Sequence, residues 1–289
     1  MKALFYPDLH KNNAYECIKN AAEILSCCGV SLMFDNIHAE TFAKYDNAVF
    51  GKYEELIANA DIVIAAGGDG TMMRCAKSIG DCGALMLGIN TGRLGFLASL
   101  EQDELHLLQK LADGEYSVNE HIMLNVCLIS GENVKYSDVA LNEVVVSRAA
   151  SHMCDFKIWV DDALVSETRA DGVMLSTPTG STAYALSAGG PLIEPYLECI
   201  EFMPICPHSL FSRPMLLSPH RCIKIVPDYS RYDKIELSCD GKKPVLLAHD
   251  DYVTVKMSDR KIRFVEIKNN SFFDSVNTKL IKPLKSYEI

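Results

Sequence analysis

The sequence lacks long hydrophobic runs, an excess of positive charge and a leader-like amino terminus. Its longest apolar runs, such as 62–66 and 84–89, fall well short of the roughly 20 residues that cross a bilayer. A formal net charge of −10 at pH 7 argues against a basic face for nucleic-acid phosphates. Pro7, Asp8 and His10 interrupt any apolar core of a signal peptide. We therefore expect a soluble, cytoplasmic protein with neither a nucleic-acid nor a membrane partner.

The sequence also lacks the cysteine and histidine patterns of metal sites. Its eleven cysteines include no Cys-x-x-Cys pair, and its eight histidines include no His-Glu-x-x-His. Most of the cysteines lie within apolar stretches such as 123–129, which is typical of buried, free thiols in a reducing compartment. We predict neither a disulfide framework nor a zinc site, and no catalytic metal held by histidine.

What is present is the composition of an ordinary globular protein. The chain has 289 residues, of which 48% are hydrophobic and 23% are charged, and this length suggests about two domains. Residues 1–112 alternate short apolar runs with helical patterns, which predicts an α/β domain with a Rossmann-like parallel sheet. The expected strands are 2–6, 31–35, 61–66 and 84–89, and the expected helices are 12–28, 52–58, 71–79 and 101–111.

From residue 113 to residue 270 the pattern changes to many short strands. Their spacing and the turn signals between them predict an all-β sandwich domain. The expected strands are 123–129, 139–147, 156–160, 172–176, 222–226, 235–239, 252–257 and 262–267. Helical spacing returns near the end of the chain, which predicts a terminal helix at about 271–289 that can pack back on the first domain.

Segment 62–71 places three glycines and an aspartate where a buried strand turns into a helix. Such a turn suits phosphate, because glycines let backbone N–H groups approach the anion and the helix dipole favours it. The segment lacks the lysine of a P-loop, and Met73 replaces the last glycine of a dinucleotide motif. Asp69 would repel phosphate unless it accepts a hydroxyl proton or holds magnesium, which favours phosphoryl transfer. The alternatives are a plain Gly-Asp-Gly turn and a helix N-cap at Thr71.

The segment Gly67-Gly68-Asp69-Gly70-Thr71 resembles the G-G-D-G-T motif that NAD kinases share with diacylglycerol and sphingosine kinases and, in variant form, with 6-phosphofructokinases. Three further segments resemble the NAD kinase family specifically: 90–96, Asn142-Glu143, and Asp171-Gly172 followed by 177–184 and 187–191. The resemblance implies an α/β amino-terminal domain, a carboxy-terminal β-sandwich, an active site between them, and a homodimer or homotetramer.

The resemblance further implies transfer of the ATP γ-phosphoryl group to the 2′-hydroxyl of the adenosine ribose of NAD, which gives NADP. Asp69 would then accept the proton of this poorly nucleophilic hydroxyl. Gly68, Gly70 and Thr71 would donate hydrogen bonds to phosphate oxygens, and Mg²⁺ would neutralise charge on the triphosphate. Arg74, one turn into the helix, either adds a guanidinium near these phosphates or is a solvated surface residue.

The NAD site is expected mainly in the β-rich half. Asn142 and Glu143 interrupt the apolar strand 139–147, where polar groups are costly unless they have partners, so we interpret them as substrate ligands. The alternative is that Asn142 faces solvent at a strand edge. The hydroxyl-rich segment 176–187 supplies donors and a tyrosine ring, although it also fits an ordinary capped helix start. By the resemblance, the candidate ligands in this half are Asn142, Glu143, His152, Arg169, Asp171, Thr182, Ala183, Tyr184 and Ser187. The alternatives are an exposed turn carboxylate for Asp171 and a half-buried polar histidine for His152.

One basic residue of this chain stands where the family pattern has another residue type. Many bacterial members have glutamine after an Asp-Gly turn, whereas this chain has Lys242 after Asp240-Gly241, and lysine lacks the acceptor of an amide. The expected cations near the phosphates are Arg74, Arg148, Arg169 and Lys242.

Two other functions compete with NAD phosphorylation. A lipid kinase would share the glycine loop but should replace Asn142-Glu143 and 177–184, and should carry an apolar or basic patch for membranes. A non-catalytic NAD-binding regulator would gain nothing from Asp69.

Overall fold

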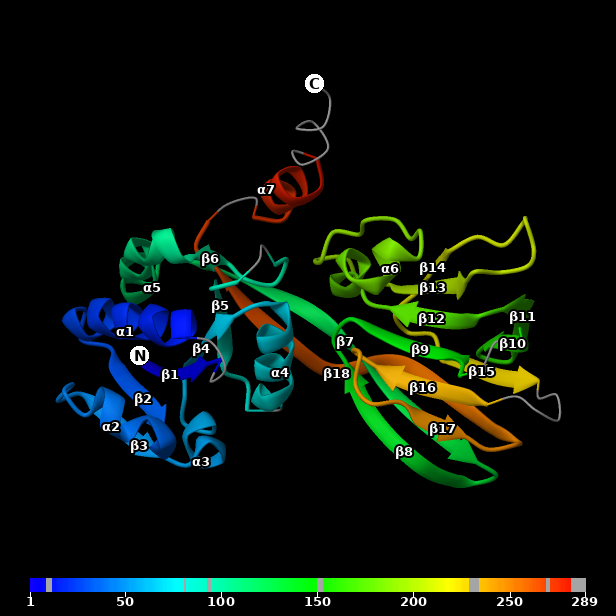
Figure 1. The fold of residues 1–289 in the computed structure, drawn as a ribbon, viewed down its shortest axis with the longest axis horizontal. Coiled ribbons are helices and arrows are strands. Elements are labelled where there is room, and N and C mark those ends of the chain that lie inside the picture. The colour runs from blue at the N-terminus through cyan, green and yellow to red at the C-terminus, as the bar shows by residue number, and fades with distance from the viewer. Residues whose placement is uncertain are drawn as a thin grey trace. The chain divides into compact units, whose positions relative to one another are not determined.

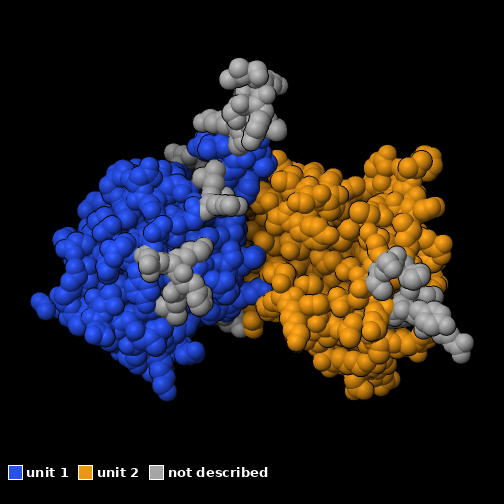
Figure 2. Space-filling view, viewed as in Figure 1, with its two compact units in different colours: residues 1–120, 262–289 blue, residues 121–261 orange. Residues whose placement is uncertain are grey.

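The structure is a computed structural model that describes residues 1–8, 12–80, 82–92, 95–149, 153–228, 234–268 and 271–281. The chain forms two compact units, residues 1–120 with 262–289 and residues 121–261 (Figure 2). The sequence predicted divisions after 112 and after 270. Two long strands, β7 (Ser117–Ser130) and β18 (Asp251–Glu266), each begin in one unit and end in the other. The change in sequence pattern therefore does not coincide with the change of unit.

The first unit is built on a parallel sheet, as the sequence predicted (Figure 1). Its strand order is β5-β4-β1-β2-β3, and the end of β18 pairs in parallel with β5. The strands are β1 (Lys2–Pro7), β2 (Ser31–Asp35), β3 (Ala48–Gly51), β4 (Ile62–Gly67) and β5 (Leu85–Asn90), with the short β6 (Leu100–Glu101) beside β5. Every residue of β4 is buried, which explains its continuous apolar run.

Helices cover this sheet. They are α1 (Asn12–Cys27), α2 (Ala39–Phe42), α3 (Tyr53–Ile57), α4 (Asp69–Ile79) and α5 (Leu108–Asp113), joined by the 3-10 turns η1 (Asn36–His38) and η2 (Gln102–Leu107). The carboxy-terminal segment forms α7 (Ser271–Val276) and a π-helical turn, η4 (Asn277–Ile281). There the Lys279 ammonium lies 4.6 Å from the centre of the Phe96 ring. None of the helices within the described ranges is both long and apolar enough to cross a membrane.

The second unit is a sandwich of two antiparallel sheets, which confirms the predicted fold class. One sheet has the order β14-β13-β12-β9-β16-β17, and the other contains β11, β10, β15, β18, β7 and β8. Their bounds are β8 (Asn133–Ala140), β9 (Glu143–Arg148), β10 (Cys154–Val160), β11 (Ala163–Ala170), β12 (Gly172–Ser176), β13 (Ile200–Ile205), β14 (Met215–Leu217), β15 (Ile223–Asp228), β16 (Ile235–Cys239) and β17 (Val245–Leu247). Apolar side chains of both sheets, such as Phe156 and Val173, form one core.

Several predicted strands differ from the observed ones. The expected strand 139–147 is two strands, because the chain leaves the ladder at Leu141 and Asn142. The expected strands 252–257 and 262–267 are one strand, β18. Strands β11 and β13 were missed, since β11 is largely exposed and polar and β13 contains Pro204 and a glutamate.

The cysteines are all free, but they are not all buried. Cys17, Cys75, Cys154 and Cys239 are buried, whereas Cys27, Cys82, Cys206 and Cys222 are exposed. The prediction of burial is therefore wrong for these four exposed residues, which lie at the ends of apolar stretches and in turns.

Candidate functional site

The glycine-rich segment forms the predicted strand–turn–helix junction in the first unit. Strand β4 ends at Gly67, and α4 begins at Asp69 with Gly68 as its extended N-cap residue. A Cβ added to Gly67 would lie 2.5 Å from the Thr71 Cβ, so only glycine permits this tight packing. Because the N-cap is Gly68, the alternative role of Thr71 as an N-cap is wrong. The junction presents the amino terminus of α4 and its first-turn N–H groups, which suit an anion.

Backbone N–H groups hold the Asp69 carboxylate in one orientation. The Phe96 N–H donates to Asp69 Oδ2 at 2.9 Å, and the Leu97 N–H donates to Asp69 Oδ1 at 3.2 Å. A Cβ at Gly95 would overlap Asp69 Oδ1, so the absent side chain makes room for the carboxylate. Sequence reasoning assigned no role to segment 95–97, although its first two residues lie in the family-like motif 90–96. Its neighbours Arg93 and Leu94 lie outside the described residues.

A second cluster on α4 joins Thr71 and Arg74 to Asp8. The Thr71 hydroxyl donates to Asp8 Oδ2 at 3.0 Å, and Arg74 Nη2 donates to Thr71 Oγ1 at 3.1 Å. Arg74 Nη2 also lies 3.9 Å from Asp8 Oδ2, while 60% of its side chain is exposed. The guanidinium is thus anchored next to the glycine loop and still accessible to a ligand. Asp8 was missed; the only signal for it was its place at the carboxyl end of a buried strand.

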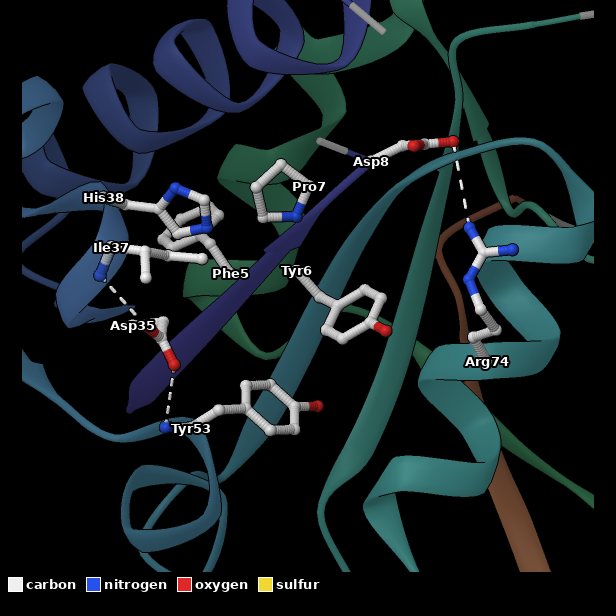
Figure 3. A pocket seen from close by; sticks show the side chains of 9 residues that line it. All are labelled: Phe5, Tyr6, Pro7, Asp8, Asp35, Ile37, His38, Tyr53 and Arg74. Atoms are coloured by element: carbon white, nitrogen blue, oxygen red, sulfur yellow. Dashed lines mark hydrogen bonds and ion pairs between the residues drawn. The ribbon is translucent and has the colours of Figure 1, made fainter. Parts of the chain in front are cut away.

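A cavity of about 600 Å³ lies at the carboxyl ends of β1 and β2 (Figure 3). It is lined by Phe5, Tyr6, Pro7, Asp8, Asp35, Ile37, His38, Tyr53 and Arg74. The rings of Tyr6 and Tyr53 meet edge to face at 5.4 Å, and Asp35 accepts the Ile37 and Tyr53 N–H groups at 3.0 and 2.9 Å. Burial raises the pKa of Tyr6 and lowers the pKa of His38, so both side chains are neutral at pH 7. Aromatic rings beside one guanidinium can take a planar group with an anionic tail.

In the second unit, the structure brings the Asn142-Glu143 pair next to the start of the hydroxyl-rich segment. The Thr177 N–H donates to the Asn142 carbonyl at 2.8 Å, and the Thr177 hydroxyl donates to the Leu141 carbonyl at 2.6 Å. Glu143 lies opposite Ser176 in the pairing of β9 with β12. Asn142 is only 8% exposed, so the alternative of a solvent-facing asparagine is wrong.

The hydroxyl-rich segment divides into buried supports and exposed groups. It forms a 3-10 turn, η3 (Thr179–Thr182), and a short helix, α6 (Tyr184–Ser187). The Ser181 hydroxyl donates to the Ile193 carbonyl at 3.1 Å and is buried, whereas 44% of Tyr184 is exposed and Ser187 is exposed. Thr182 and Ala183 are partly buried. The accessible part of the segment therefore includes the tyrosine ring expected to stack on a base.

A buried histidine supports this segment and was missed. His121 Nδ1 lies 2.9 Å from Thr179 Oγ1, and the His121 ring meets Tyr196 edge to face at 6.4 Å. Burial lowers the pKa of His121 to about 4, so the ring is neutral at pH 7. Only the change from a polar to an apolar pattern at the start of the β-rich half marks this position in the sequence.

Arg169 and Asp171 lie at the other end of β12 from this cluster. Asp171 directly precedes β12 and Thr177 directly follows it, so six residue steps along the strand separate them by roughly 20 Å. Arg148 Nε donates to Asp171 at 2.8 Å, and Arg169 pairs with Asp155 at 2.9 and 2.7 Å. The structure does not bring these residues to Asn142 and Glu143 within one chain. His152 lies outside the described residues.

The four expected cations all pair with carboxylates. Arg74 faces Asp8, Arg148 faces Asp171, Arg169 faces Asp155, and Lys242 faces Asp138 at 2.7 Å. Arg74 lies beside the glycine loop of its own unit, and the gathering of the four cations at one phosphate site stays a prediction. Within the ranges that the structure describes, no group of three histidine, cysteine or acidic side chains could hold a metal ion.

The α/β unit carries a G-G-D-G-T turn at a helix amino terminus, and the β-sandwich carries a polar cluster suited to binding a substrate. Together, these features define a class of nucleotide-binding kinases. Residues 9–116 match the family model of the ATP-NAD kinase N-terminal domain, and residues 141–267 match that of the ATP-NAD kinase C-terminal domain. The chain belongs to the ATP-NAD kinase family.

Individual relatives match most of the chain or nearly all of it. The NAD kinase of Caldanaerobacter subterraneus subsp. tengcongensis is 34% identical over 276 residues, which cover 95% of this chain and 96% of the relative. That of Desulforamulus reducens is 39% identical over 229 residues, covering 78% and 79%. The crystal structure of yeast NADH kinase complexed with NADH has a TM-score of 0.86 at 26% identity and covers 97% of this chain and 87% of its own. An Archaeoglobus fulgidus NAD kinase in complex with ATP has a TM-score of 0.70 at 30% identity, covering 96% and 99%.

Proposed function

We propose that this chain is an NAD kinase, which transfers the ATP γ-phosphoryl group to the 2′-hydroxyl of the adenosine ribose of NAD and forms NADP and ADP. The observation that carries the proposal is the Asp69 carboxylate, fixed at the start of α4 by the Phe96 and Leu97 N–H groups. A fixed anion is unfavourable at a phosphate site unless it accepts a proton or holds magnesium. We assign the proton to Asp69, because the described residues offer no group of three side chains that could hold a metal ion. Membership of the ATP-NAD kinase family is the reason for proposing ATP and NAD as the substrates.

In this reaction Asp69 accepts the proton of the 2′-hydroxyl as its oxygen attacks the γ-phosphorus. The bond from the γ-phosphorus to the β,γ-bridging oxygen breaks, and ADP leaves with that bond's electron pair. The N–H groups of Gly68 and Gly70 at the amino terminus of α4 stabilise the transferring group, together with the accessible guanidinium of Arg74. The Thr71 hydroxyl, which donates to Asp8, fixes Arg74 in turn.

The dinucleotide is proposed to bind at the cluster of Asn142, Glu143 and the exposed part of segment 182–187. Glu143 and Asn142 offer acceptors for hydroxyls and amines, and the Tyr184 ring offers a stacking surface. Contacts from Arg169 and Asp171 would need a ligand that spans β12 or a second copy of the chain, which agrees with the proposed homodimer or homotetramer. The free thiols suit the reducing cytoplasm, where we place the enzyme.

Magnesium is proposed to enter as part of the substrate, MgATP. The described residues offer no three-ligand protein cage for it. Phosphate oxygens and water supply most ligands of Mg²⁺ in such complexes, and the ion neutralises the charge of the triphosphate.

The test is NADP formation from NAD and MgATP by the wild-type chain and by Asp69→Asn, followed with a dehydrogenase that accepts only NADP. We expect Asp69→Asn to lose about 10²–10⁴-fold in kcat, because the amide cannot accept the proton, while calorimetry shows NAD binding within a few-fold of wild type. Asp61→Asn is the matched control, since Asp61 accepts the Lys2 N–H at 2.7 Å at the other end of β4.

Full turnover in Asp69→Asn would contradict the assignment of the base. A wild-type chain that binds NAD but forms no NADP with any triphosphate would instead favour a non-catalytic regulator.

A further inference from the structure

The turn between β16 and β17 holds the segment that carries Asn142 and Glu143. The Asp240 carboxylate accepts three consecutive backbone N–H groups: Leu141 to Oδ2 at 2.9 Å, Asn142 to Oδ1 at 2.8 Å and Glu143 to Oδ1 at 3.0 Å. The Asp240 N–H donates back to the Glu143 carbonyl at 2.9 Å. One residue of the turn therefore makes four hydrogen bonds to three residues of the segment.

These bonds satisfy backbone N–H groups at the point where the chain leaves the strand ladder. The chain leaves the ladder between Ala140, where β8 ends, and Glu143, where β9 begins. Successive N–H groups that point to one side form a concave site for an anion, and here the anion is a side chain of the protein. Such charge-assisted hydrogen bonds are roughly twice as strong as neutral ones.

The carbonyl side of the same segment is held as well. Leu141 and Asn142 carbonyls accept hydrogen bonds from Thr177, at 2.6 Å from its hydroxyl and 2.8 Å from its N–H. The segment is thus fixed between the Asp240 carboxylate and the start of the hydroxyl-rich segment. Both N–H and carbonyl groups of this segment are hydrogen-bonded, so a shift of Asn142 or Glu143 would break several bonds at once.

We propose that Asp240 is a positioning residue for NAD, acting through Asn142 and Glu143 without touching the nucleotide. The proposal rests on the proposed function, because it takes these two side chains as NAD ligands. Asp240 has a positive φ of 49°, a conformation that aspartate and asparagine tolerate and most residues do not. The residue is therefore suited both to the turn and to the three bonds.

The same arrangement explains the lysine that departs from the family pattern. Lys242 Nζ donates to both oxygens of Asp138 at 2.9 and 2.7 Å, and Asp138 lies on β8 three residues before Leu141. Lys242 thereby ties the turn to the strand that leads into the segment. We assign it to the support of the turn rather than to a phosphate contact.

The test is Asp240→Asn in the full chain. Asparagine keeps the size and the positive φ, but its amide has one acceptor oxygen and places N–H donors against backbone N–H groups. We expect the KM and the calorimetric Kd for NAD to rise by about 10- to 100-fold, while the KM for ATP stays within about twofold. Asp161→Asn is the matched control, because Asp161 has a φ of 54° in another turn and accepts the Cys222 N–H at 3.0 Å.

A double variant separates positioning from general loss of structure. If Asp240 acts through the segment, the losses of NAD affinity in Asp240→Asn and Asn142→Ala should be less than additive in the double variant, because part of the effect of Asp240 is already lost with the Asn142 side chain. Fully additive losses would overturn the proposal, as would an unchanged Kd for NAD in Asp240→Asn. Should Asp240→Asn not fold, Lys242→Met loosens the same turn, and we expect a rise of about two- to fivefold in the KM for NAD. No rise there would overturn the proposal. A wild-type chain that forms no NADP would overturn the proposed function instead.

Discussion

Glu201 is a carboxylate buried in the sandwich unit with no hydrogen bond to either oxygen from the described residues. It lies on β13 and is 0% exposed. A Cβ at Gly190 would lie 2.5 Å from its Oε1, so Gly190 packs directly on the carboxylate. Burial raises the pKa of Glu201 to about 7, and the pKa of the nearby Cys199 thiol is raised first by burial and then by this carboxylate. Glu201 therefore makes the stability of this unit depend on pH.

The direction follows from proton linkage. Because the pKa of Glu201 is raised from 4.5 to about 7 on folding, the folded state binds more protons in this window and stability falls as the pH rises through it. We expect Glu201→Gln to raise the free energy of unfolding by about 1–3 kcal/mol at pH 8 and by much less at pH 5. Urea denaturation at the two pH values measures this difference.

Glu167→Gln is the control for this prediction, because Glu167 is an exposed carboxylate on β11 of the same unit. We expect it to show no such dependence on pH. An equal effect of Glu201→Gln at pH 5 and pH 8 would show that Glu201 does not titrate in this window.

Among single residues, the sequence alone identifies as functional candidates those whose side chains are unusual for the local pattern. Asp69 was identifiable because a carboxylate among glycines is costly near phosphate, and Asn142 and Glu143 because they interrupt an apolar strand. Asp8 and Asp240 were not assigned roles, since their importance comes from partners 63 and 97–99 residues away in the chain. Local patterns contain no information about such partners.

Among the elements, segment 95–97 and helix α4 depend on each other. Gly95 has no space for a side chain because the Asp69 carboxylate occupies it. Gly95→Ala should therefore displace the carboxylate and lower kcat by about 10²-fold or more, although every side chain of α4 is kept. Steady-state NADP formation, with NAD binding by calorimetry, measures the effect.

Gly51→Ala provides the comparison for this substitution. A Cβ there would meet only the flexible Leu56 side chain, at 3.0 Å, so we expect nearly normal turnover with a small loss of stability. Wild-type kcat in Gly95→Ala would show that the orientation of Asp69 does not depend on this segment.

Elements with strong periodicity were predictable, and those at edges were not. Strands β1, β2 and β4 and helix α1 were located to within a few residues, because buried apolar runs and a 3.6-residue period mark them clearly. Strand β11 was missed because most of its residues are exposed. The break between β8 and β9 was missed because the backbone N–H of Asn142 there donates to the carboxylate of Asp240, which lies far along the chain.

For the whole molecule, the eleven free cysteines give a direct test of its packing. Four thiols are exposed, and burial raises the pKa of Cys17 to about 12 and also raises that of Cys75. We expect about four thiols to react rapidly with a soluble aromatic disulfide in the native protein, since thiolate character and exposure govern the rate. All eleven should react after unfolding in denaturant without a reducing agent.

Fewer than eleven reactive thiols in denaturant would reveal a disulfide. Rapid native reaction of Cys17 or Cys75, identified by mass spectrometry of the labelled peptides, would contradict the packing of α1 or α4 on the sheet.

The crossing of the chain at β7 and β18 has a consequence for synthesis on the ribosome. The second unit is a continuous stretch, residues 121–261, whereas the first unit also needs residues 262–281. Val265 and Ile267 lie in the core of the first unit, and the Val265 carbonyl accepts the Ser99 hydroxyl at 2.6 Å. Since domains fold as units while the chain emerges, the part of the molecule that is translated first acquires its complete core last. The nascent α/β unit lacks one of the partner strands of β5 until β18 has been translated.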